Sequence, residues 1–303
     1  MERFSVVIPL YQDEVNIRAF FENNLIEIRK ANRDSRILLV DDTGNENAYT
    51  VIRPLVGGNV VWIRHDRNRG FGRSVNEGVA LAQTEIVFVF NSDIAVTAGT
   101  FEPVLDHFKA GDVFAVTLKS TFPDGRIREG AKAMAWKSGL PEIKHSPKDF
   151  PKPSTDGRIV SFYPVGGHFA VRRSMFLELG GYDIGLFDPF YWEDTDLGVR
   201  AMKRGWKTVY EPRAEVIHSH DHSTIKTHFQ REAIVEIRNR NRIFFALKNY
   251  GSFYHQTAIR LGLGLRMVQN LLKTGNPAAS YRRTLGFVKQ YKRICHENRS
   301  LDR

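Results

Sequence analysis

Short apolar runs alternate with amphipathic stretches through the first third of the chain. Four of these runs predict buried strands, at residues 4–9, 36–41, 60–64 and 85–90. Helices are predicted between them: one from Ile17 to Ile28, where apolar residues keep helical spacing and Asp13 is a candidate cap, and two at 46–55 and 71–82. Because strands and helices alternate in this way, we predict an α/β fold with a mostly parallel central sheet flanked by helices.

The later part of the chain is less regular. A Pro-rich loop is expected at 144–158, followed by a short strand, a glycine turn, a helix near 173–180 and a helix from about 194 to 204. From residue 224 onward the pattern is helical, with breaks near Gly251 and at 275–277. We therefore expect an α/β domain over 1–223 and a basic helical C-terminal extension over 224–303.

The composition is that of a globular protein. The chain has 303 residues, of which 42% are hydrophobic and 26% charged, so a disordered chain is excluded. Cys295 is the single cysteine, which excludes an internal disulfide and a Cys-based metal site. The apolar runs are far shorter than the ~20 residues of a membrane span, and the N-terminus does not resemble a signal peptide. We expect a soluble, cytoplasmic protein.

The positive charge is concentrated in the helical extension. Residues 224–303 hold 16 Lys and Arg against 4 Asp and Glu, whereas the rest of the chain is close to neutral. The basic residues alternate with apolar ones: Phe244, Phe245, Leu247, Leu261, Leu263, Leu265, Val268, Leu271 and Leu272 lie among Arg238, Arg240, Arg242, Lys248, Arg260, Arg266 and Lys273. Such helices can lie on an anionic membrane surface, can form a dimer interface, or can simply present a solvated face.

Polar residues follow three of the predicted strands directly. In an open parallel sheet, ligands bind beyond the carboxyl ends of the strands, which here are 9–11, 41–42 and 91–93. Asp41 and Asp42 could accept hydrogen bonds from ribose hydroxyls or could form a turn and cap a helix. Asp93 follows five apolar residues, so a buried strand would hold it rigidly as a ligand for a hard cation. A polar turn that closes the strand is the alternative.

Two further acidic or histidine clusters are candidates for chemistry. Trp192, Glu193 and Asp194 open a predicted helix, where the helix dipole keeps Asp194 ionised, as a general base must be. His218 is the first of three histidines at alternate positions, and one of them as a metal ligand is more plausible than three. Acids in a first helical turn and solvated histidines at a strand end remain the structural alternatives.

Two nucleotide-binding motifs are missing. The first strand is followed by Leu10-Tyr11-Gln12-Asp13-Glu14 rather than by a Gly-x-Gly-x-x-Gly turn, which excludes a typical nicotinamide or flavin site. No P-loop is present either.

The motifs taken in order closely resemble the family 2 glycosyltransferases, in particular bacterial rhamnosyltransferases. The resemblance covers about residues 3–223 and rests on Val6–Tyr11, Val40–Asp42, Asn68–Gly72, Asn91–Asp93, Gly166–Phe169, Gly180–Asp183, Trp192–Leu197, Arg200–Trp206 and His218. It implies a GT-A fold with a nucleotide-binding half at 1–95 and an acceptor-binding half at 96–223. It also implies an inverting transfer of a sugar from a nucleoside diphosphate to a hydroxyl of a glycan or lipid-linked glycan.

The resemblance also implies roles for individual residues. Asp194 matches the catalytic base, and Asp93 and His218 match ligands of a Mn²⁺ or Mg²⁺ ion. Residues that match the nucleotide-sugar site are Pro9, Tyr11, Glu14, Asp41, Asp42, Asn68, Arg73, Asn91 and Ser92. Gly166, Gly167, His168, Trp192 and Glu193 would form the acceptor or sugar pocket, with the glycines allowing close approach of the backbone and Trp192 either stacking on a sugar or filling the core.

One position departs from the family pattern. Asn91 replaces the first acid of the Asp-x-Asp motif, which weakens the expected metal affinity without the diphosphate and gives His218 more weight. By family habit, UDP or dTDP donors are expected rather than GDP donors, with rhamnose as the candidate sugar.

The basic extension could meet an anionic membrane at its cytoplasmic face or a second copy of the chain. Nucleic acid is not expected as a partner. The alternative functions are a sugar-phosphate nucleotidyltransferase, a protein that binds nucleic acid or anionic lipid through the extension, and an inactive glycan-binding relative.

Overall fold

The first half of the central sheet is parallel. The computed structural model describes residues 4–56, 60–218, 229–274 and 285–296. Its first four strands lie in the order β3-β2-β1-β4, and these are β1 (Phe4–Leu10), β2 (Arg36–Asp41), β3 (Val60–Arg64) and β4 (Ile86–Phe90). All four strands were predicted from their apolar runs. The strand order reverses between β1 and β4, which places a crevice beyond the carboxyl ends of these two strands.

The second half of the sheet continues from β4 with mixed strand directions. The sheet continues through β11, β6, β12 and β10, while β5 pairs with β12 and β7 pairs with β6. Their bounds are β5 (Ile94–Val96), β6 (Val113–Thr121), β7 (Ile127–Glu129), β10 (Ile159–Ser161), β11 (His168–Arg172) and β12 (Lys207–His218). β11 is antiparallel to both β4 and β6, whereas β6 and β12 are parallel. One continuous sheet therefore joins the two halves.

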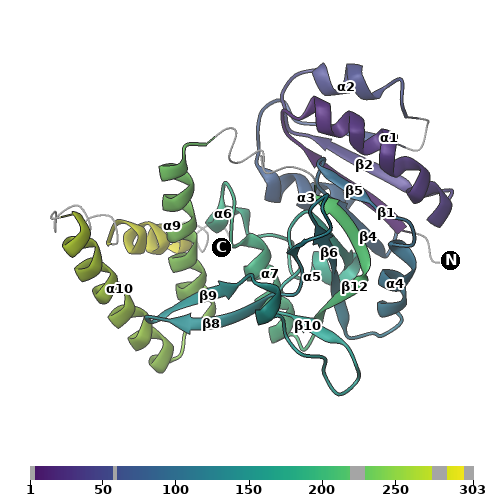
Figure 1. Cartoon of the computed structure of the whole chain (residues 1–303). Coiled ribbons are helices and arrows are strands. Elements are labelled where there is room, and N and C mark those ends of the chain that lie inside the picture. Colours follow the sequence, from purple (N-terminus) through teal and green to yellow (C-terminus); the bar gives the residue numbers. More distant parts are fainter. Residues whose placement is uncertain (1–3, 57–59, 219–228, 275–284, 297–303) are drawn as a thin grey trace.

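Helices cover both faces of this sheet (Figure 1). They are α1 (Glu14–Ala31), α2 (Asn47–Ile52), α3 (Phe71–Leu81), α4 (Phe101–His107), α5 (Arg173–Glu178), α6 (Ile184–Phe187) and α7 (Glu193–Lys203). Side chains of β1 alternate between the faces: Val6 packs in the cluster of α1, and Val7 packs in the cluster of α3. Asp13 precedes α1, but its side chain makes no capping bond to the helix backbone.

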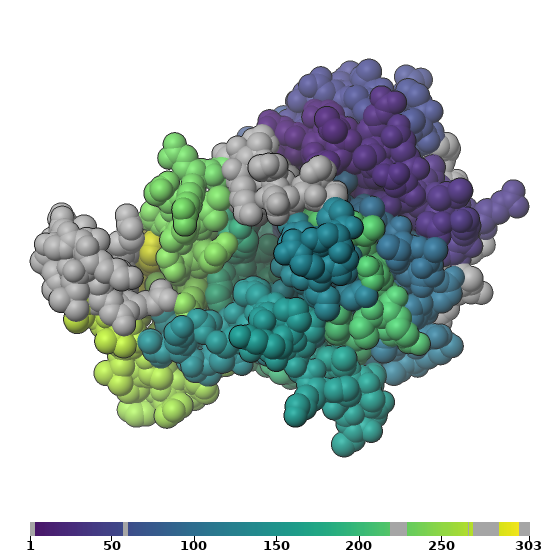
Figure 2. Space-filling model, viewed as in Figure 1, coloured from purple at the N-terminus to yellow at the C-terminus, as the bar shows by residue number. Residues whose placement is uncertain are grey.

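A hairpin and two long helices extend the molecule beyond the sheet. The hairpin consists of β8 (Ala133–Lys137) and β9 (Leu140–Lys144), and the helices are α9 (Arg231–Asn249) and α10 (Phe253–Thr274). A short 3-10 helix, Pro147–Asp149, lies in the predicted Pro-rich loop, and residues 285–296 form a further helix. Figures 1 and 2 show α9 and α10 at the opposite end of the molecule from α1 and α2.

The hairpin turn packs closely on α10. Gly139 has a φ of +72°, and a Cβ there would come within 2.9 Å of the Gly262 backbone in α10. A Cβ on Gly262 would in turn meet the backbone of Ser138 and Gly139. Only glycine at both positions permits this contact, which seats the hairpin turn on α10.

The apolar side of α9 faces the rest of the chain rather than a membrane or a partner. Phe244 and Phe245 are fully buried, and they pack in one cluster with Leu186, Phe187 and Trp192. Phe244 and Phe245 are therefore not available for the membrane or dimer contact considered for these helices, because α6 and α7 already cover them. On α10, by contrast, large apolar side chains are exposed: Phe253, Tyr254, Leu261, Leu265 and Val268.

Part of the predicted extension lies outside the described residues. These are the domain boundary at 223, the break at 275–277, and the side chains of Arg266, Leu271, Leu272 and Lys273. The division into 1–95, 96–223 and 224–303 stays a prediction. No helix in the described part of the chain is long and apolar enough to span a membrane.

Candidate active site

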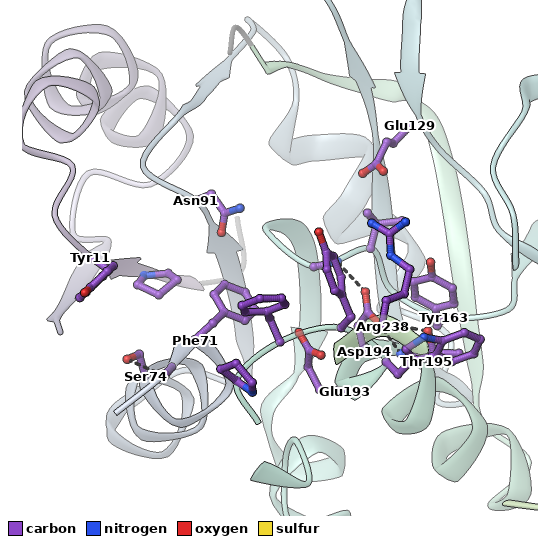
Figure 3. A pocket seen from close by; sticks show the side chains of 18 of the residues that line it. Tyr11, Phe71, Ser74, Asn91, Glu129, Tyr163, Glu193, Asp194, Thr195 and Arg238 are labelled. Carbon is purple, nitrogen blue, oxygen red and sulfur yellow. Dashed lines mark hydrogen bonds between the residues drawn. The ribbon is translucent and has the colours of Figure 1, made fainter. Parts of the chain in front are cut away.

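A cavity of about 760 Å³ opens beyond the carboxyl ends of β1 and β4, in the crevice that the strand order creates. Residues predicted from the sequence that line it are Pro9, Tyr11, Asp42, Asn68, Asn91, Ser92, Asp93, Gly166, Trp192, Glu193, Asp194 and His218. Figure 3 shows Tyr11, Ser74 and Asn91 on one side of the cavity and Tyr163, Asp194 and Arg238 on the other. One wall belongs to the predicted nucleotide-binding half, and the other to the predicted acceptor-binding half together with α9. After these predictions they are called here the nucleotide wall and the acceptor wall.

Asp42 shapes the nucleotide wall by holding a loop. Its carboxylate accepts hydrogen bonds from the backbone N–H groups of Arg69, at 2.7 Å, and Gly70, at 2.8 Å. It also accepts one from Nδ1 of His65, at 2.7 Å, and this ring is buried. Asn68 Oδ1 accepts a second bond from the Gly70 N–H at 2.8 Å. Asp42 and Asn68 therefore fix the loop that leads into α3. Asp42 thus forms a turn, as the structural alternative expected, and it also lines the cavity.

Asp41 lies beside the cavity without lining it. Its side chain is buried, and Oδ1 accepts a bond from the Thr43 N–H at 3.1 Å. Its Oδ2 has no hydrogen-bond partner in the described part of the chain. Glu14 begins α1 and Arg73 is exposed on α3, and neither lines the cavity.

Asp93 and His218 meet at the base of the cavity. Nε2 of His218 lies 2.8 Å from Oδ2 of Asp93, although the two residues are 125 positions apart. β5 and the end of β12 bring them together, because His218 pairs with Ile94 in the sheet. Burial disfavours the charged form of Asp93, but the hydrogen bond and charge of His218 outweigh this, and the pKa of Asp93 is lowered.

These two residues fit part of a metal site. Asp93 Oδ1 and His218 Nδ1 are buried, and neither has a hydrogen-bond partner among the residues described. The 2.8 Å separation is close to that of two adjacent octahedral ligands with bonds of about 2.1 Å. Within the described ranges, no group of three or more His, Cys, Asp or Glu side chains could hold an ion alone. A divalent ion there would need further oxygen ligands, such as those of a diphosphate.

Asn91 and Ser92 follow β4 directly and line the cavity. The Asn91 N–H donates to the Gly167 carbonyl at 2.9 Å, and Ser92 Oγ donates to Asp13 Oδ2 at 2.5 Å. Gly167 has a φ of +92°, and a Cβ there would lie 2.3 Å from the Asn91 amide. The missing side chain of Gly167 therefore makes room for Asn91, rather than opening the backbone toward the cavity.

Asp194 lies on the acceptor wall in the first turn of α7. Its Oδ1 accepts bonds from the Thr195 N–H, at 2.6 Å, and from Thr195 Oγ1, at 3.1 Å, and its Oδ2 lies 3.4 Å from the Gly166 N–H. Burial raises the pKa of Asp194 to about 6, although these hydrogen bonds offset part of the effect. The group is ionised above that pH, so the expected ionised state at neutral pH agrees with this value.

Glu193 differs from its neighbour. Burial, and then the charge of Asp194, raise its pKa well above the ordinary value, which favours the protonated form. Its Oε2 has no partner in the described residues. The raised pKa of Glu193 thus favours negative charge on Asp194 over negative charge on Glu193.

The rings of two residues predicted for the sugar pocket, His168 and Trp192, pack in the core. His168 is fully buried in β11 and does not line the cavity, and burial lowers its pKa to about 3. Trp192 lines the cavity at one edge, but its ring packs against Phe245 of α9 with centroids 5.0 Å apart. The core-filling alternative is the one that the structure shows for the Trp192 ring.

A family model described as "Glycosyl transferase family 2" matches residues 5–180. The chain belongs to glycosyl transferase family 2. The matched segment includes the nucleotide wall and ends before Asp194 and α9.

Curated relatives of this family 2 member are glycosyltransferases. It is 29% identical over 197 residues to N-acetylglucosaminyl-diphospho-decaprenol L-rhamnosyltransferase of Mycobacterium tuberculosis, a match over 55% of this chain and 61% of that protein. It is 26% identical over 221 residues to pre-mycofactocin glycosyltransferase of the same organism, over 71% of this chain and 42% of that protein. The chain thus spans less than two thirds of the length of these relatives.

Solved structures confirm the GT-A fold. GalNAc-T7 with UDP, GalNAc and Mn²⁺ matches with a TM-score of 0.61 and 17% identity, over 82% of this chain and 48% of that one. The mannosyltransferase PcManGT of Pyrobaculum calidifontis, with GDP-Man and Mn²⁺, matches with a TM-score of 0.56 and 14% identity, over 97% and 85% of the two chains. At these identities the likeness concerns the fold.

Much of the acceptor wall of this family 2 member was not predicted. The residues come from β7, the hairpin, α7, α9 and the loops beside these elements. They are Arg128, Glu129, Glu142, Ile143, His145, Tyr163, Pro189, Phe190, Tyr191, Thr195, Phe229, Arg238, Asn239 and Arg242. The sequence carried one usable signal. Arg238 and Arg242 are four residues apart and therefore share a helix face.

Proposed function

We propose that the chain is an inverting glycosyltransferase that moves a sugar from a nucleoside diphosphate to a hydroxyl of a glycan or lipid-linked glycan. The observation that carries this proposal is the pairing, in one cavity, of Asp194 with the Asp93–His218 pair. In this assignment a base with a pKa of about 6 would face the acceptor hydroxyl, and two candidate metal ligands would face the leaving diphosphate. Membership of family 2 supports the same assignment.

The chain's own residues can accept the proton that the acceptor hydroxyl releases. Asp194 takes the proton of the acceptor hydroxyl while that oxygen forms a bond to the anomeric carbon from the face opposite the diphosphate. The bond between the anomeric carbon and the diphosphate oxygen breaks, and its electron pair leaves with the diphosphate. The raised pKa of Glu193 favours its protonated form, in which it would not compete for the proton.

Asp93 and His218 would hold a Mn²⁺ or Mg²⁺ ion together with the donor. Such an ion stabilises the negative charge that develops on a departing diphosphate. Asn91 and Ser92 lie beside Asp93 and can contact the donor as neutral groups. The nucleoside would lie on the opposite side, against Pro9, Tyr11 and the loop that Asp42 fixes.

The relatives and the residues of the acceptor wall support a class of donor and a class of acceptor. The name of the rhamnosyltransferase of M. tuberculosis supports a deoxyhexose such as L-rhamnose, from a dTDP or UDP donor, and an acceptor sugar linked through a diphosphate to a lipid. Arg238 and Arg242 line the acceptor wall, and the Arg238 guanidinium lies 4.8 Å from the centroid of the Tyr191 ring. Aromatic and guanidinium groups together suit a sugar that carries an anionic substituent.

A thermal-shift experiment tests the proposal. We expect UDP or dTDP to stabilise the protein in the presence of Mn²⁺, by about 2.7 kcal/mol at a hundred times the dissociation constant. Asp93→Ala should abolish the metal-dependent part, whereas Asp34→Ala, at an exposed acid in the turn before β2, should keep it. No stabilisation by UDP, dTDP or GDP would overturn the donor assignment and favour a polyanion bound by the basic extension.

We also propose that α10 contacts an anionic membrane surface from the cytoplasmic side. Phe253, Tyr254 and Leu261 are 87%, 76% and 70% exposed, and Arg260 adjoins them. Exposed aromatic and aliphatic side chains beside a cation suit a lipid headgroup layer. Co-sedimentation with anionic vesicles that is unchanged in a Phe253→Ser, Leu261→Ser variant would count against this contact, and a dimer through the same face is the alternative.

A further inference from the structure

One asparagine of α9 contacts the backbone that leads to Asp194. Asn241 is fully buried, and its Nδ2 lies 2.9 Å from each of the carbonyl oxygens of Phe187, Phe190 and Tyr191. Its Oδ1 accepts a hydrogen bond from Arg240 Nε at 2.9 Å. Because a guanidinium only donates, this bond assigns the oxygen end of the amide and directs the NH₂ group toward the three carbonyls.

The backbone that Asn241 contacts is strained. Tyr191 and Trp192 have φ values of +72° and +76°, a region that non-glycine residues rarely occupy. Two consecutive residues of this kind persist only where the surrounding structure holds them, and such strain is concentrated at functional sites. The Tyr191 carbonyl belongs to the peptide that joins these two residues, and it accepts a bond from Asn241. Glu193 and Asp194 follow directly.

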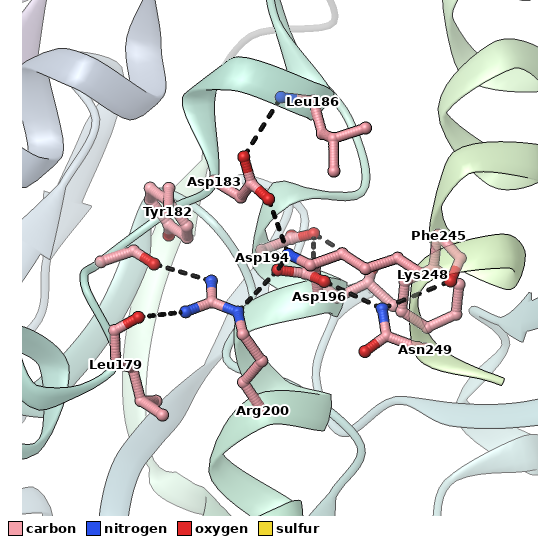
Figure 4. A network of polar contacts seen from close by, with 12 residues as sticks. Leu179, Tyr182, Asp183, Leu186, Asp194, Asp196, Arg200, Phe245, Lys248 and Asn249 are labelled. Atoms are coloured by element: carbon pink, nitrogen blue, oxygen red, sulfur yellow. Dashed lines mark hydrogen bonds and ion pairs between the residues drawn. The ribbon is translucent and has the colours of Figure 1, made fainter. Parts of the chain in front are cut away.

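The far end of α9 holds α7 itself (Figure 4). Lys248 Nζ donates to Asp183 Oδ2, at 2.7 Å, and to Asp196 Oδ2, at 2.8 Å. Asn249 Nδ2 donates to Asp196 Oδ1 at 2.8 Å. Asp196 is fully buried two residues after Asp194, so contacts from α9 hold the chain on both sides of the base.

We propose that Asn241 is a positioning residue, which holds the left-handed turn at Tyr191 and Trp192 and thereby directs Asp194 at the acceptor hydroxyl. The inference rests on the proposed function of Asp194 as the base. It assigns a role in the reaction to a helix that lies outside the segment matched by the family model. Asn241 itself does not line the cavity, so it acts through the backbone.

The test removes the amide donors without removing the helix. Asn241→Asp keeps the size of the side chain but presents an oxygen to three carbonyl oxygens, and Asn241→Ser is the milder variant in case the first does not fold. Ile243→Ala is the matched control, because Ile243 is buried on the same helix but packs in the cluster of Leu140, away from the turn. All four proteins are assayed for turnover of dTDP-L-rhamnose with Mn²⁺ and for hydrogen exchange.

We expect kcat to fall about 100-fold in the Asn241 variants, since a displacement of about 1 Å at a reacting group has that effect. The KM for the donor should stay unchanged, because the nucleotide wall is untouched. The acid limb of the pH–rate profile should move to lower pH as water reaches Asp194, which a purely structural role would not cause. Backbone amides of residues 192–195 should exchange faster in the Asn241 variants and not in Ile243→Ala.

Two results would overturn the proposal. One is a kcat and pH profile in Asn241→Ser equal to those of the native protein, and the other is an equal loss in Ile243→Ala. Failure of the proposed function is a separate outcome, in which the native protein neither binds nor turns over any nucleotide sugar. In that case the hydrogen exchange still decides, because unchanged protection of residues 192–195 would refute the role of Asn241.

Discussion

The two walls of the cavity are built by different means. The nucleotide wall comes largely from residues directly after buried strands, as Tyr11 follows β1 and Asn91 follows β4. The acceptor wall combines the hairpin, the segment before α7 and a face of α9, which are distant in the sequence. Asn241, for example, contacts Phe187 across 54 positions. The first wall is fixed mainly by local sequence and the second by packing between distant segments.

The largest effect on the rate is expected from a substitution of the candidate base on the acceptor wall. Asp194→Asn removes the proton acceptor while keeping shape, so transfer should fall by about 10²–10⁴-fold. Donor binding, measured by thermal shift with UDP or dTDP and Mn²⁺, should be unchanged because it depends on the other wall. Native turnover in Asp194→Asn would refute its assignment as the base.

The pH dependence of the transfer rate tests the same residue of the acceptor wall, Asp194. Burial raises the pKa of Asp194 to about 6, and only the ionised form accepts a proton. The rate should therefore fall as the pH drops through about 6, by about tenfold for each further pH unit. Binding of the nucleotide at each pH serves as the control. A rate that is maintained down to about pH 4 would indicate a base with the ordinary pKa of an aspartate.

The smallest effect concerns recognition on the acceptor wall alone. Arg238→Ala removes a charge-assisted contact, so the KM for an anionic acceptor should rise about tenfold or more, while the donor KM stays constant. Arg231→Ala, an exposed change on the same helix, is the control. A rise in the donor KM instead would place Arg238 against the diphosphate and erase the distinction between the walls.

The sequence predicts the nucleotide wall well because strands and the turns after them are local. A run such as Ile86 to Phe90 must be buried, and the residue type that follows it then lies at the sheet edge. His168 shows the limit of this reasoning. It follows two glycines in a motif, but it is the first residue of β11 and pairs with Phe90, which places its ring in the interior.

The acceptor wall could not be predicted in the same way. An amphipathic basic helix has the same pattern whether its apolar side meets a membrane, a partner or its own chain. Phe244 and Phe245 meet their own chain, and this depends on the position of α6 and α7. The strained turn at Tyr191 and Trp192 leaves no signal either, because neither residue is one that usually adopts a positive φ.

The place of α9 in the chain has a consequence for biosynthesis. All strands of the central sheet precede α9, so on the ribosome the nucleotide wall can form before Asn241 is added to the chain. Until then the turn at Tyr191 and Trp192 lacks the hydrogen bonds from Asn241, on which we propose that the direction of Asp194 depends. A nascent chain that already binds nucleotide would therefore remain inactive until α9 docks, which separates the time at which the donor can bind from the time at which it can be consumed.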